Sequence, residues 1–301
     1  MMTTTPRRHR RFSPRRSRTL LATLALVTGS LLAPPSAGAV PRPGAGPCAT
    51  STTANYSHVV WIVLENVGYS LVGSPRAPSF NALAGECGLA TNDLAVAHPS
   101  LPNYLALTSG STQGVTDDAE PASHPLAVAN IFSQLRTKWR AYAESMPSPC
   151  DRVTSGTYAA RHNPVVYYTN VPSCARNDVT LSTPLNLSAA FTFVAPNVCD
   201  DMHSCPVAVG DAWLRHFVAL VVASAQYRAG SLALFITVDE NDQSATNRVP
   251  TIVVAPTVAR GQRVSTPFTH YSLLRTTEAL LHLPFIGGAR SASSMVSAFH
   301  L

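Results

Sequence analysis

Four short stretches of the chain are almost wholly apolar and rich in β-branched residues. They cover residues 58–64, 190–194, 232–238 and 251–254. Continuous apolar runs of this length are typical of strands that are buried on both faces of a parallel sheet. Stretches with a helical pattern lie between them, at 126–138, 209–227 and 272–281. Strands that alternate with helices predict an α/β fold, a three-layer α/β/α sandwich around a mostly parallel sheet.

The first 39 residues have the pattern of an export signal. Seven arginines lie between Arg7 and Arg18, an apolar run extends from Leu20 to Ala33, and small residues precede Val40. A basic region, a short apolar region and a small-residue cleavage site make up a secretory signal peptide. The apolar run is too short for an ordinary transmembrane helix. We therefore expect a secreted, extracellular protein with no transmembrane segment in its mature chain.

The charge of the mature chain differs from that of the whole sequence. The 301 residues include 22 basic and 16 acidic side chains, a net charge of +6. Without the seven arginines of the signal, 15 basic and 16 acidic residues remain, a net charge of −1. The chain thus gives no reason to expect nucleic-acid binding. We expect a flexible leader at 40–54 and a single catalytic domain at 55–301, which is long enough to bury a large core.

All six cysteines follow the predicted cleavage site. An even number of cysteines in an exported chain indicates disulfides, and six cysteines allow 15 pairings. Zinc binding by these cysteines has little support, because no two of them are separated by only two residues. If neighbours in the sequence pair with each other, the disulfides are Cys48–Cys87, Cys150–Cys174 and Cys199–Cys205.

Polar side chains directly follow two of the predicted buried strands, although only 13% of the residues are charged. Glu65 and Asn66 follow the first strand, and Asp239 and Glu240 follow the strand at 232–238. In open α/β sheets, binding sites form at the carboxyl ends of the strands. Clustered carboxylates repel one another, and carboxylate and amide oxygens are good ligands for hard cations. The pattern predicts a metal site, and a solvated turn is the alternative for each segment taken alone.

Ser100 precedes a short predicted helix with Pro102 in its first turn. A hydroxyl at this position lies over free backbone N–H groups and the positive end of the helix, where a phosphate is stabilised. Asn103, one turn further on, is placed to donate its amide to a phosphoryl oxygen. Taken alone, Ser100 is more simply interpreted as the N-cap of the helix.

Three histidines and one more acid complete the candidate chemistry. Asp201 and His203 lie in the short loop between the last two cysteines, and His270 directly precedes a predicted helix. A neutral imidazole can ligate a metal or hydrogen-bond a phosphoryl oxygen. His162 follows Arg161, whose guanidinium can bind phosphate or pair with a carboxylate. We expect His162 to face the site and leave the role of Arg161 open.

Taken in order, these segments resemble the phosphoesterase family that contains bacterial phospholipases C and secreted acid phosphatases, within the alkaline-phosphatase-like superfamily. Secreted acid phosphatases of the mycobacterial type are the most similar group. The similar segments cover nearly all of the mature chain. They are residues 64–66, 98–107, 201–203, 210–214, 239–251 and 270–271.

The resemblance implies an alkaline-phosphatase-like fold in which Ser100 attacks phosphorus and forms a phosphoserine. The residues that it implies for the phosphoryl transfer are Ser100, Asn103, His162, His203 and His270. The residues expected to ligate a divalent metal ion are Glu65, Asn66, Ser100, Asp201, Asp239 and Glu240. Cys199 stands where the wider superfamily places an aspartate, which leaves one metal ion or two open.

We therefore expect a metal-dependent phosphomonoesterase of the acid phosphatase type. Its substrates would be small phosphate esters or a phosphoinositide or other lipid head group. Phosphodiester cleavage of the phospholipase C type is the alternative among enzymes. A non-catalytic secreted binding protein on the same scaffold is the alternative outside them.

Overall fold

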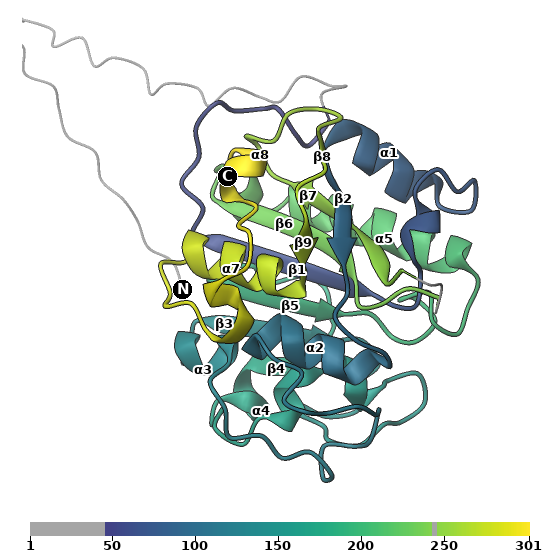
Figure 1. Cartoon of the computed structure of the whole chain (residues 1–301), viewed down its shortest axis with the longest axis vertical. Helices are drawn as coiled ribbons and strands as arrows, with labels where there is room; N and C mark the ends of the chain where they lie inside the picture. Colours follow the sequence, from purple (N-terminus) through teal and green to yellow (C-terminus); the bar gives the residue numbers. More distant parts are fainter. Residues whose placement is uncertain (1–45, 243–245) are drawn as a thin grey trace, which may run out of the picture. The chain divides into compact units, whose positions relative to one another are not determined.

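The computed structural model describes residues 46–242 and 246–301 (Figure 1). The predicted export signal and the first part of the predicted leader lie outside these residues. Among the described residues, nine strands form one sheet in the order β4-β3-β5-β1-β6-β7-β2-β8, with β9 also paired to β2. The strands are β1 His58–Leu64, β2 Gly88–Leu94, β3 Trp139–Ala143, β4 Asp178–Thr180, β5 Phe191–Ala195, β6 Leu232–Val238, β7 Arg248–Val254, β8 Arg263–Val264 and β9 Phe268–Thr269.

The sheet is mixed but mostly parallel, which confirms the predicted fold class. The central strand β1 pairs in parallel with both β5 and β6. The antiparallel member is β7, which contains the predicted strand at 251–254 and lies between β6 and β2. Because β1, β5 and β6 run in the same direction, their carboxyl ends meet at one edge of the sheet.

Helices cover both faces of the sheet, as the predicted three-layer architecture requires. In Figure 1, α2 and α7 lie in front of the sheet and pack against each other, while α1 and α5 pack together as the second helical layer. The α-helices are α1 Pro78–Glu86, α2 Ser100–Ser109, α3 Ile131–Leu135, α4 Cys174–Asn177, α5 Val207–Val222, α6 Ala225–Arg228, α7 His270–Leu280 and α8 Val296–Phe299. The 3₁₀ helices are η1 Tyr69–Leu71, η2 Ala160–His162, η3 Pro164–Tyr167 and η4 Gly287–Arg290. Among the described helices, none is long and apolar enough to span a bilayer.

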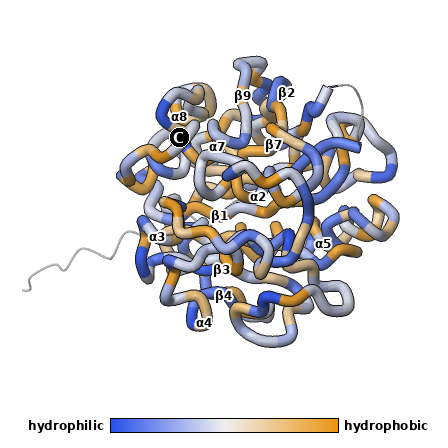
Figure 2. Tube along the Cα trace, turned by 60° about the horizontal axis from the view of Figure 1, so that its bottom comes forward, coloured by the Kyte–Doolittle hydropathy of each residue, from blue (hydrophilic) through white to orange (hydrophobic). Residues whose placement is uncertain are grey.

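The apolar runs of the sequence form the centre of the core. Every residue of β6 is buried, and so are the last six residues of β1. Figure 2 shows hydrophobic residues in the central strands and more hydrophilic ones in the peripheral loops. Strands without a polar face need apolar cover on both sides, and the two helical layers provide it.

Two predicted helices are shorter than their apolar patterns indicated. The stretch at 126–138 contains a helix only at α3, because Asn130 and Ser133 form a capping box at its start and Arg136 ends it at φ +59°. The chain then enters β3, so the local helical pattern was overridden by sheet pairing. The stretch at 209–227 is divided into α5 and α6 by Ser224, whose hydroxyl accepts the N–H of Tyr227.

The three disulfides join neighbouring cysteines, which confirms the expected pairing: Cys48–Cys87, Cys150–Cys174 and Cys199–Cys205. The first attaches the chain upstream of β1 to the end of α1. There the N–H groups of Ala49 and Thr50 also donate to the carbonyls of Val258 and Pro256. The part of the predicted leader that begins at Cys48 is thus held against the domain.

Asp93 is a buried acid in β2 that offers a test of the packing. Thr251 donates to its Oδ2 at 2.7 Å, and its Oδ1 has no hydrogen-bond partner among the described residues. Burial raises the pKa of Asp93 to about 7. Since the folded state holds this proton more tightly than the unfolded state, the contribution of Asp93 to stability is lost as pH rises from about 4 to about 7.

We predict that Asp93→Asn is more stable than the wild type at pH 8 but not at pH 5. The amide stays neutral at both values, whereas the wild-type carboxyl must ionise in the core at pH 8. Urea unfolding at each pH gives the unfolding free energy of the variant minus that of the wild type. This difference should be roughly 1–3 kcal/mol larger at pH 8 than at pH 5. A difference that is independent of pH would contradict the raised pKa.

Candidate active site

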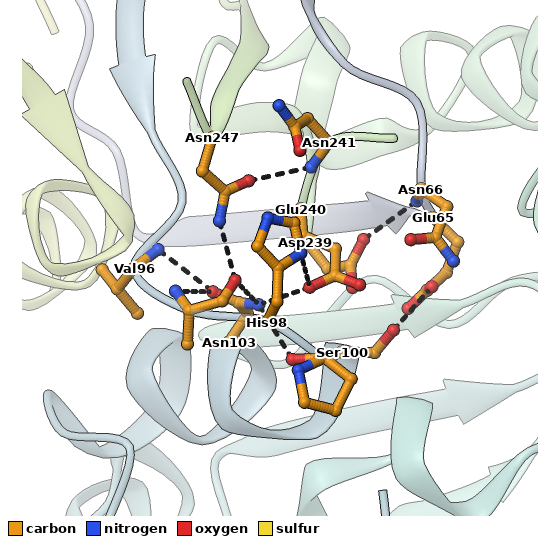
Figure 3. Close-up of polar contacts among 12 residues, drawn as sticks. Glu65, Asn66, Val96, His98, Ser100, Asn103, Asp239, Glu240, Asn241 and Asn247 are labelled. Carbon is orange, nitrogen blue, oxygen red and sulfur yellow. Dashed lines mark hydrogen bonds and ion pairs between the residues drawn. The ribbon is translucent and has the colours of Figure 1, made fainter. Parts of the chain in front are cut away.

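Ser100 is the first residue of α2 and its hydroxyl points into the protein (Figure 3). Its Oγ donates a hydrogen bond of 3.0 Å to Glu65 Oε2, and the residue is buried. Pro99 occupies the N-cap position, and Asp118 accepts the free N–H of Leu101 instead. The interpretation of Ser100 as a helix cap is therefore wrong, because its hydroxyl faces a carboxylate rather than the helix backbone.

The carboxyl ends of β1 and β6 bring Glu65 and Asp239 together, although they are 174 residues apart in the sequence. Leu64 and Val238 are register partners, so the next residue of each strand emerges at the same point. Asn66 then adopts a left-handed conformation at φ +53°, which asparagine tolerates well, and its backbone N–H donates to Asp239 Oδ1 at 3.1 Å. The predicted convergence of these two strand ends is present in the structure.

His162 lies between two carboxylates. Its Nε2 is 3.1 Å from Glu65 Oε1 and its Nδ1 is 3.1 Å from Asp201 Oδ2. The ring comes from η2 and stacks on Tyr104 of α2, with 5.4 Å between ring centroids. The prediction that His162 faces the site agrees with this position, and burial lowers its imidazole pKa well below the usual value. A neutral ring therefore stands among several acids.

Burial of several acids close together dominates the electrostatics of the site. Burial raises the pKa of Glu65, and the charges of Asp239 and Asp201 raise it further. Burial also raises the pKa values of Asp201 and Asp239. One oxygen of each acid lacks a hydrogen-bond partner among the described residues: Glu65 Oε1, Asp201 Oδ2 and Asp239 Oδ2. Such an arrangement is costly without a proton or a cation.

Asn103 holds the loop that leads into Ser100. Its Oδ1 accepts the backbone N–H groups of Val96 and Ala97, and its Nδ2 donates to the carbonyls of Ala97 and Pro99. The same Nδ2 lies 3.3 Å from Glu240 Oε2 (Figure 3). Asn103 therefore fixes the backbone before the serine, and its expected contact with a phosphoryl oxygen remains a prediction.

Glu240 lies beside His98, which the sequence placed next to Ser100 without giving it a role. His98 Nδ1 is 2.7 Å from Glu240 Oε2. The pKa of Glu240 is nevertheless raised to about 7, by burial and by the charge of Asp118. Glu240 thus connects the loop after β6 to the loop before α2, on the Asn103 side of the cluster (Figure 3).

The two remaining histidines have different surroundings. His270, the first residue of α7, is buried, and its Nε2 lies 2.5 Å from the carbonyl oxygen of Asp239. Burial lowers the pKa of His270 to about 4, so its neutral ring supports the backbone at Asp239. His203 is exposed, and its backbone N–H donates to Asp201 Oδ1 at 2.8 Å. The loop that holds Asp201 and His203 is closed by the Cys199–Cys205 disulfide.

A second group of potential ligands does not form a metal site. Cys150, Cys174 and Asp178 have ligand atoms within 4.8 Å of one another. However, the two sulfurs are joined in a disulfide, so no thiolate is available to bind a cation. Asp178 instead accepts the amide of Asn163 at 2.9 Å.

The fold and the site together define a class of enzyme. A serine hydroxyl at a helix start, beside carboxylates at the carboxyl edge of a mostly parallel sheet, is suited to the hydrolysis of phosphoric esters. The chain belongs to the Phosphoesterase family, whose model matches residues 72–284. It is a phosphoric ester hydrolase of this family.

Comparison with known proteins supports this assignment. The chain is 34% identical over 286 residues to the phosphatidylinositol-3-phosphatase of Mycobacterium tuberculosis, covering 90% of this chain and 91% of the relative. It is 26% identical to an acid phosphatase of Aspergillus fumigatus, of which it spans 66% while 89% of this chain is covered. An alkaline phosphatase superfamily protein from Vibrio parahaemolyticus has a similar fold, with a TM-score of 0.53, 12% identity and coverage of 81% and 72% of the two chains. The expected family is confirmed, and so is the expected fold.

We predict that Glu65→Gln stabilises the metal-free protein. Burial and the charges of Asp239 and Asp201 penalise the ionised wild-type carboxyl, whereas the amide carries no charge. The unfolding free energy without metal should therefore rise by about 1–3 kcal/mol at pH 8, the usual cost of an unsatisfied buried polar group. The measurement is urea unfolding in the presence of a chelator.

The matched control for this variant is Glu86→Gln, which changes a partly exposed acid at the end of α1. It should alter the unfolding free energy by less than about 0.5 kcal/mol. A Glu65→Gln protein that is less stable than the wild type at pH 8 would contradict the repulsion between the buried acids.

Proposed function

We propose that the protein is a secreted, metal-dependent phosphomonoesterase that works through a phosphoserine at Ser100. The observation that carries this proposal is the hydrogen bond between Ser100 Oγ and Glu65 Oε2 at the start of α2. It holds a hydroxyl in a buried position, next to carboxylates that repel one another. A serine with a purely structural role has little reason to occupy this position.

The donor set fits a hard divalent cation. Buried oxygens of Glu65, Asp201 and Asp239 have no hydrogen-bond partner among the described residues, and a cation beside Glu65 and Asp239 would offset the repulsion between these acids. The residues that would hold it are Glu65, Asn66, Ser100 and Asp239, with Asp201 on the His162 side and Glu240 on the Asn103 side. A bound cation there would lower the pKa of the Ser100 hydroxyl and balance charge on the phosphoryl group.

The residues of the chain define the order of bond changes. Ser100 Oγ attacks phosphorus, and its proton is directed toward Glu65 Oε2 along the existing hydrogen bond. The bond between phosphorus and the oxygen of the leaving alcohol breaks, which leaves a phosphoserine. Water then attacks the phosphorus, the bond between phosphorus and Ser100 Oγ breaks, and inorganic phosphate is released. Ser100 Oγ recovers its proton from Glu65 along the same hydrogen bond. Asn103 keeps the preceding loop in place throughout, because it binds both its N–H groups and its carbonyls.

Of the two histidines His203 and His270, His203 is the better placed to donate a proton to the leaving alcohol. Its ring is exposed and lies 5.9 Å from the ring of His162, centroid to centroid. His270 is buried, and its Nε2 is already in contact with the carbonyl oxygen of Asp239. We therefore propose that His203 supplies this proton, although burial and the charge of Arg161 lower its imidazole pKa, and that His270 has a positioning role.

The names of the relatives support a proposal for the substrate class. A phosphatidylinositol-3-phosphatase and an acid phosphatase both take their names from the removal of phosphate from an ester. We propose small phosphate monoesters, including phosphoinositide head groups, as substrates. The three disulfides fit the oxidising environment that a secreted protein enters.

We predict that Ser100→Ala lowers kcat for p-nitrophenyl phosphate by at least about 10⁴-fold, because the variant has no nucleophile at this position. Chelation should abolish wild-type activity, and adding back a divalent metal should restore it. The wild type should also trap phosphate on the peptide that contains Ser100 after an acid quench, as detected by mass spectrometry.

Two results would overturn this assignment. Faster hydrolysis of bis-p-nitrophenyl phosphate than of the monoester would favour a phosphodiesterase of the phospholipase C type. Activity that survives both Ser100→Ala and thorough chelation would exclude the proposed mechanism. Folding of the variant is checked by its thermal unfolding, since loss of one hydroxyl should change Tm by only a few degrees.

We predict that the protein exported by a secreting host begins at Val40. The signal peptidase cleaves after small residues, and Ala37-Gly38-Ala39 provides such a site. Mass spectrometry of the purified extracellular protein gives the N-terminus directly. An intact Met1 in the extracellular protein would contradict the export signal.

A further inference from the structure

A closed ring of contacts surrounds the nucleophile. From Ser100 it passes to Glu65, His162 and Asp201, and then through the backbone of His203 to the side chain of the same residue. It returns through two side chains that have no role in the proposed chemistry so far. These are Arg161 and Asp118, and Asp118 accepts the N–H of Leu101, the residue next to Ser100.

Arg161 is a guanidinium with an unsatisfied donor at the edge of the site. Its Nε is buried and has no hydrogen-bond partner among the described residues, with Asp118 Oδ2 at the longer ion-pair distance of 3.8 Å. Its Nη2 lies 3.4 Å from Nε2 of His203. A buried donor without an acceptor costs about 1–3 kcal/mol. An anion that accepts from this guanidinium would recover that cost.

Asp118 occupies a position that suits a phosphoryl oxygen. Its Oδ1 accepts the Leu101 N–H at 2.9 Å, at the N-terminus of the ten-residue helix α2 and one residue from the nucleophile. Its Oδ2 faces Arg161. A helix N-terminal N–H and an arginine are both groups that bind phosphate oxygens. The side chain is 35% exposed, so it can leave this position without disturbing the core.

We propose that the Asp118 carboxylate, in the absence of substrate, occupies the position that the phosphoryl group of the substrate takes when it binds. Arg161 is then a substrate-binding residue. When a phosphomonoester binds, the Asp118 carboxylate is displaced, and the Leu101 N–H and Arg161 then donate to the non-bridging phosphoryl oxygens. This inference rests on the proposed function, since it assumes that the phosphoryl group lies next to Ser100.

Arg161 gives the site a preference for doubly charged phosphoryl groups. Displacing the Asp118 carboxylate costs the same for every anion, whereas the attraction to the guanidinium grows with the charge of the anion. A phosphate monoester carries up to two charges, whereas a diester carries one. Arg161 thereby favours monoesters through charge.

A simpler role for Asp118 is that of a cap that stabilises α2. The two roles differ in their dependence on charge. Asp118→Asn keeps an oxygen that can accept the Leu101 N–H but loses the negative charge, so a cap would be largely preserved. A competitor for phosphate would instead be weakened, because the neutral amide no longer pairs with Arg161 and repels no anion.

The experiment measures the binding of inorganic phosphate to the metal-loaded full-length mature protein by calorimetry, with no turnover involved. Arg161→Met should weaken phosphate binding by about 10- to 100-fold, as expected for the loss of a charged hydrogen-bond donor of about 1.4–3 kcal/mol. Asp118→Asn should tighten it by about 3- to 10-fold. A shift of this size corresponds to the removal of one partly screened like charge.

Each variant has a matched control on the same chain. Asp117→Asn removes the neighbouring acid, which pairs with His124 at 2.6 Å. Arg215→Met removes an exposed arginine on α5. Both controls should leave the phosphate Kd within twofold of the wild type. Tm values of all four variants show whether any change in binding comes from unfolding.

The ratio of kcat/KM for p-nitrophenyl phosphate to that for its diester gives a second readout. It should fall in Arg161→Met, because a doubly charged substrate loses more from the missing guanidinium. The inference is wrong if Asp118→Asn leaves the phosphate Kd within twofold, or weakens binding as Arg161→Met does, or if the wild type binds no phosphate. The proposed function instead fails if the wild type binds phosphate normally but hydrolyses no monoester.

Discussion

The parallel pairing of β1 with β6 is the constraint on which the site depends. These two strands are in register up to Leu64 and Val238, so the acids that follow them are forced into one buried volume. Neither strand has a polar face that could turn toward water. The repulsion between Glu65 and Asp239 is therefore built into the sheet, and several neighbouring segments supply a group that compensates for it.

The compensating groups come from separate parts of the chain. The N–H of Asn66 binds Asp239, the hydroxyl of Ser100 binds Glu65, and the imidazole of His162 lies beside Glu65. Each is a donor or a neutral group, and none carries a fixed positive charge. The cluster thus remains short of positive charge within the protein itself, which is why a cation fits the proposed chemistry.

The sequence alone was sufficient to predict those features of the fold and the site that depend on a single local pattern. The buried strands β1 and β6 had continuous apolar runs, and the acids after them could be placed at one edge because parallel strands share a direction. The disulfides followed sequence order, because each joins segments that lie close along the chain. The fold class and the convergence of Glu65 with Asp239 were accordingly predictable.

Other features depend on contacts that no local pattern encodes. The stretch at 126–138 has a helical pattern, yet β3 begins directly after it because β5 offers a pairing partner. His162 had the least support from the sequence but lies centrally, since η2 reaches the site only through tertiary packing. No pattern in the sequence pointed to Asp118, because its proposed role depends on the free N–H of a helix that begins 18 residues earlier.

The same reasoning explains why the loop before α2 is so heavily hydrogen-bonded. The proposed nucleophile must be held within a fraction of an ångström, but the loop that leads into Ser100 has no regular pattern of backbone hydrogen bonds. The Asn103 side chain supplies hydrogen bonds in their place, to N–H and carbonyl groups of the loop. Asn247 adds a hydrogen bond of 2.7 Å to the Ala97 carbonyl. Side-chain amides can do this because each carries donor and acceptor atoms without net charge. An acidic residue here would have added to the repulsion at the site, so the use of asparagine rather than aspartate is consistent with the same buried acids.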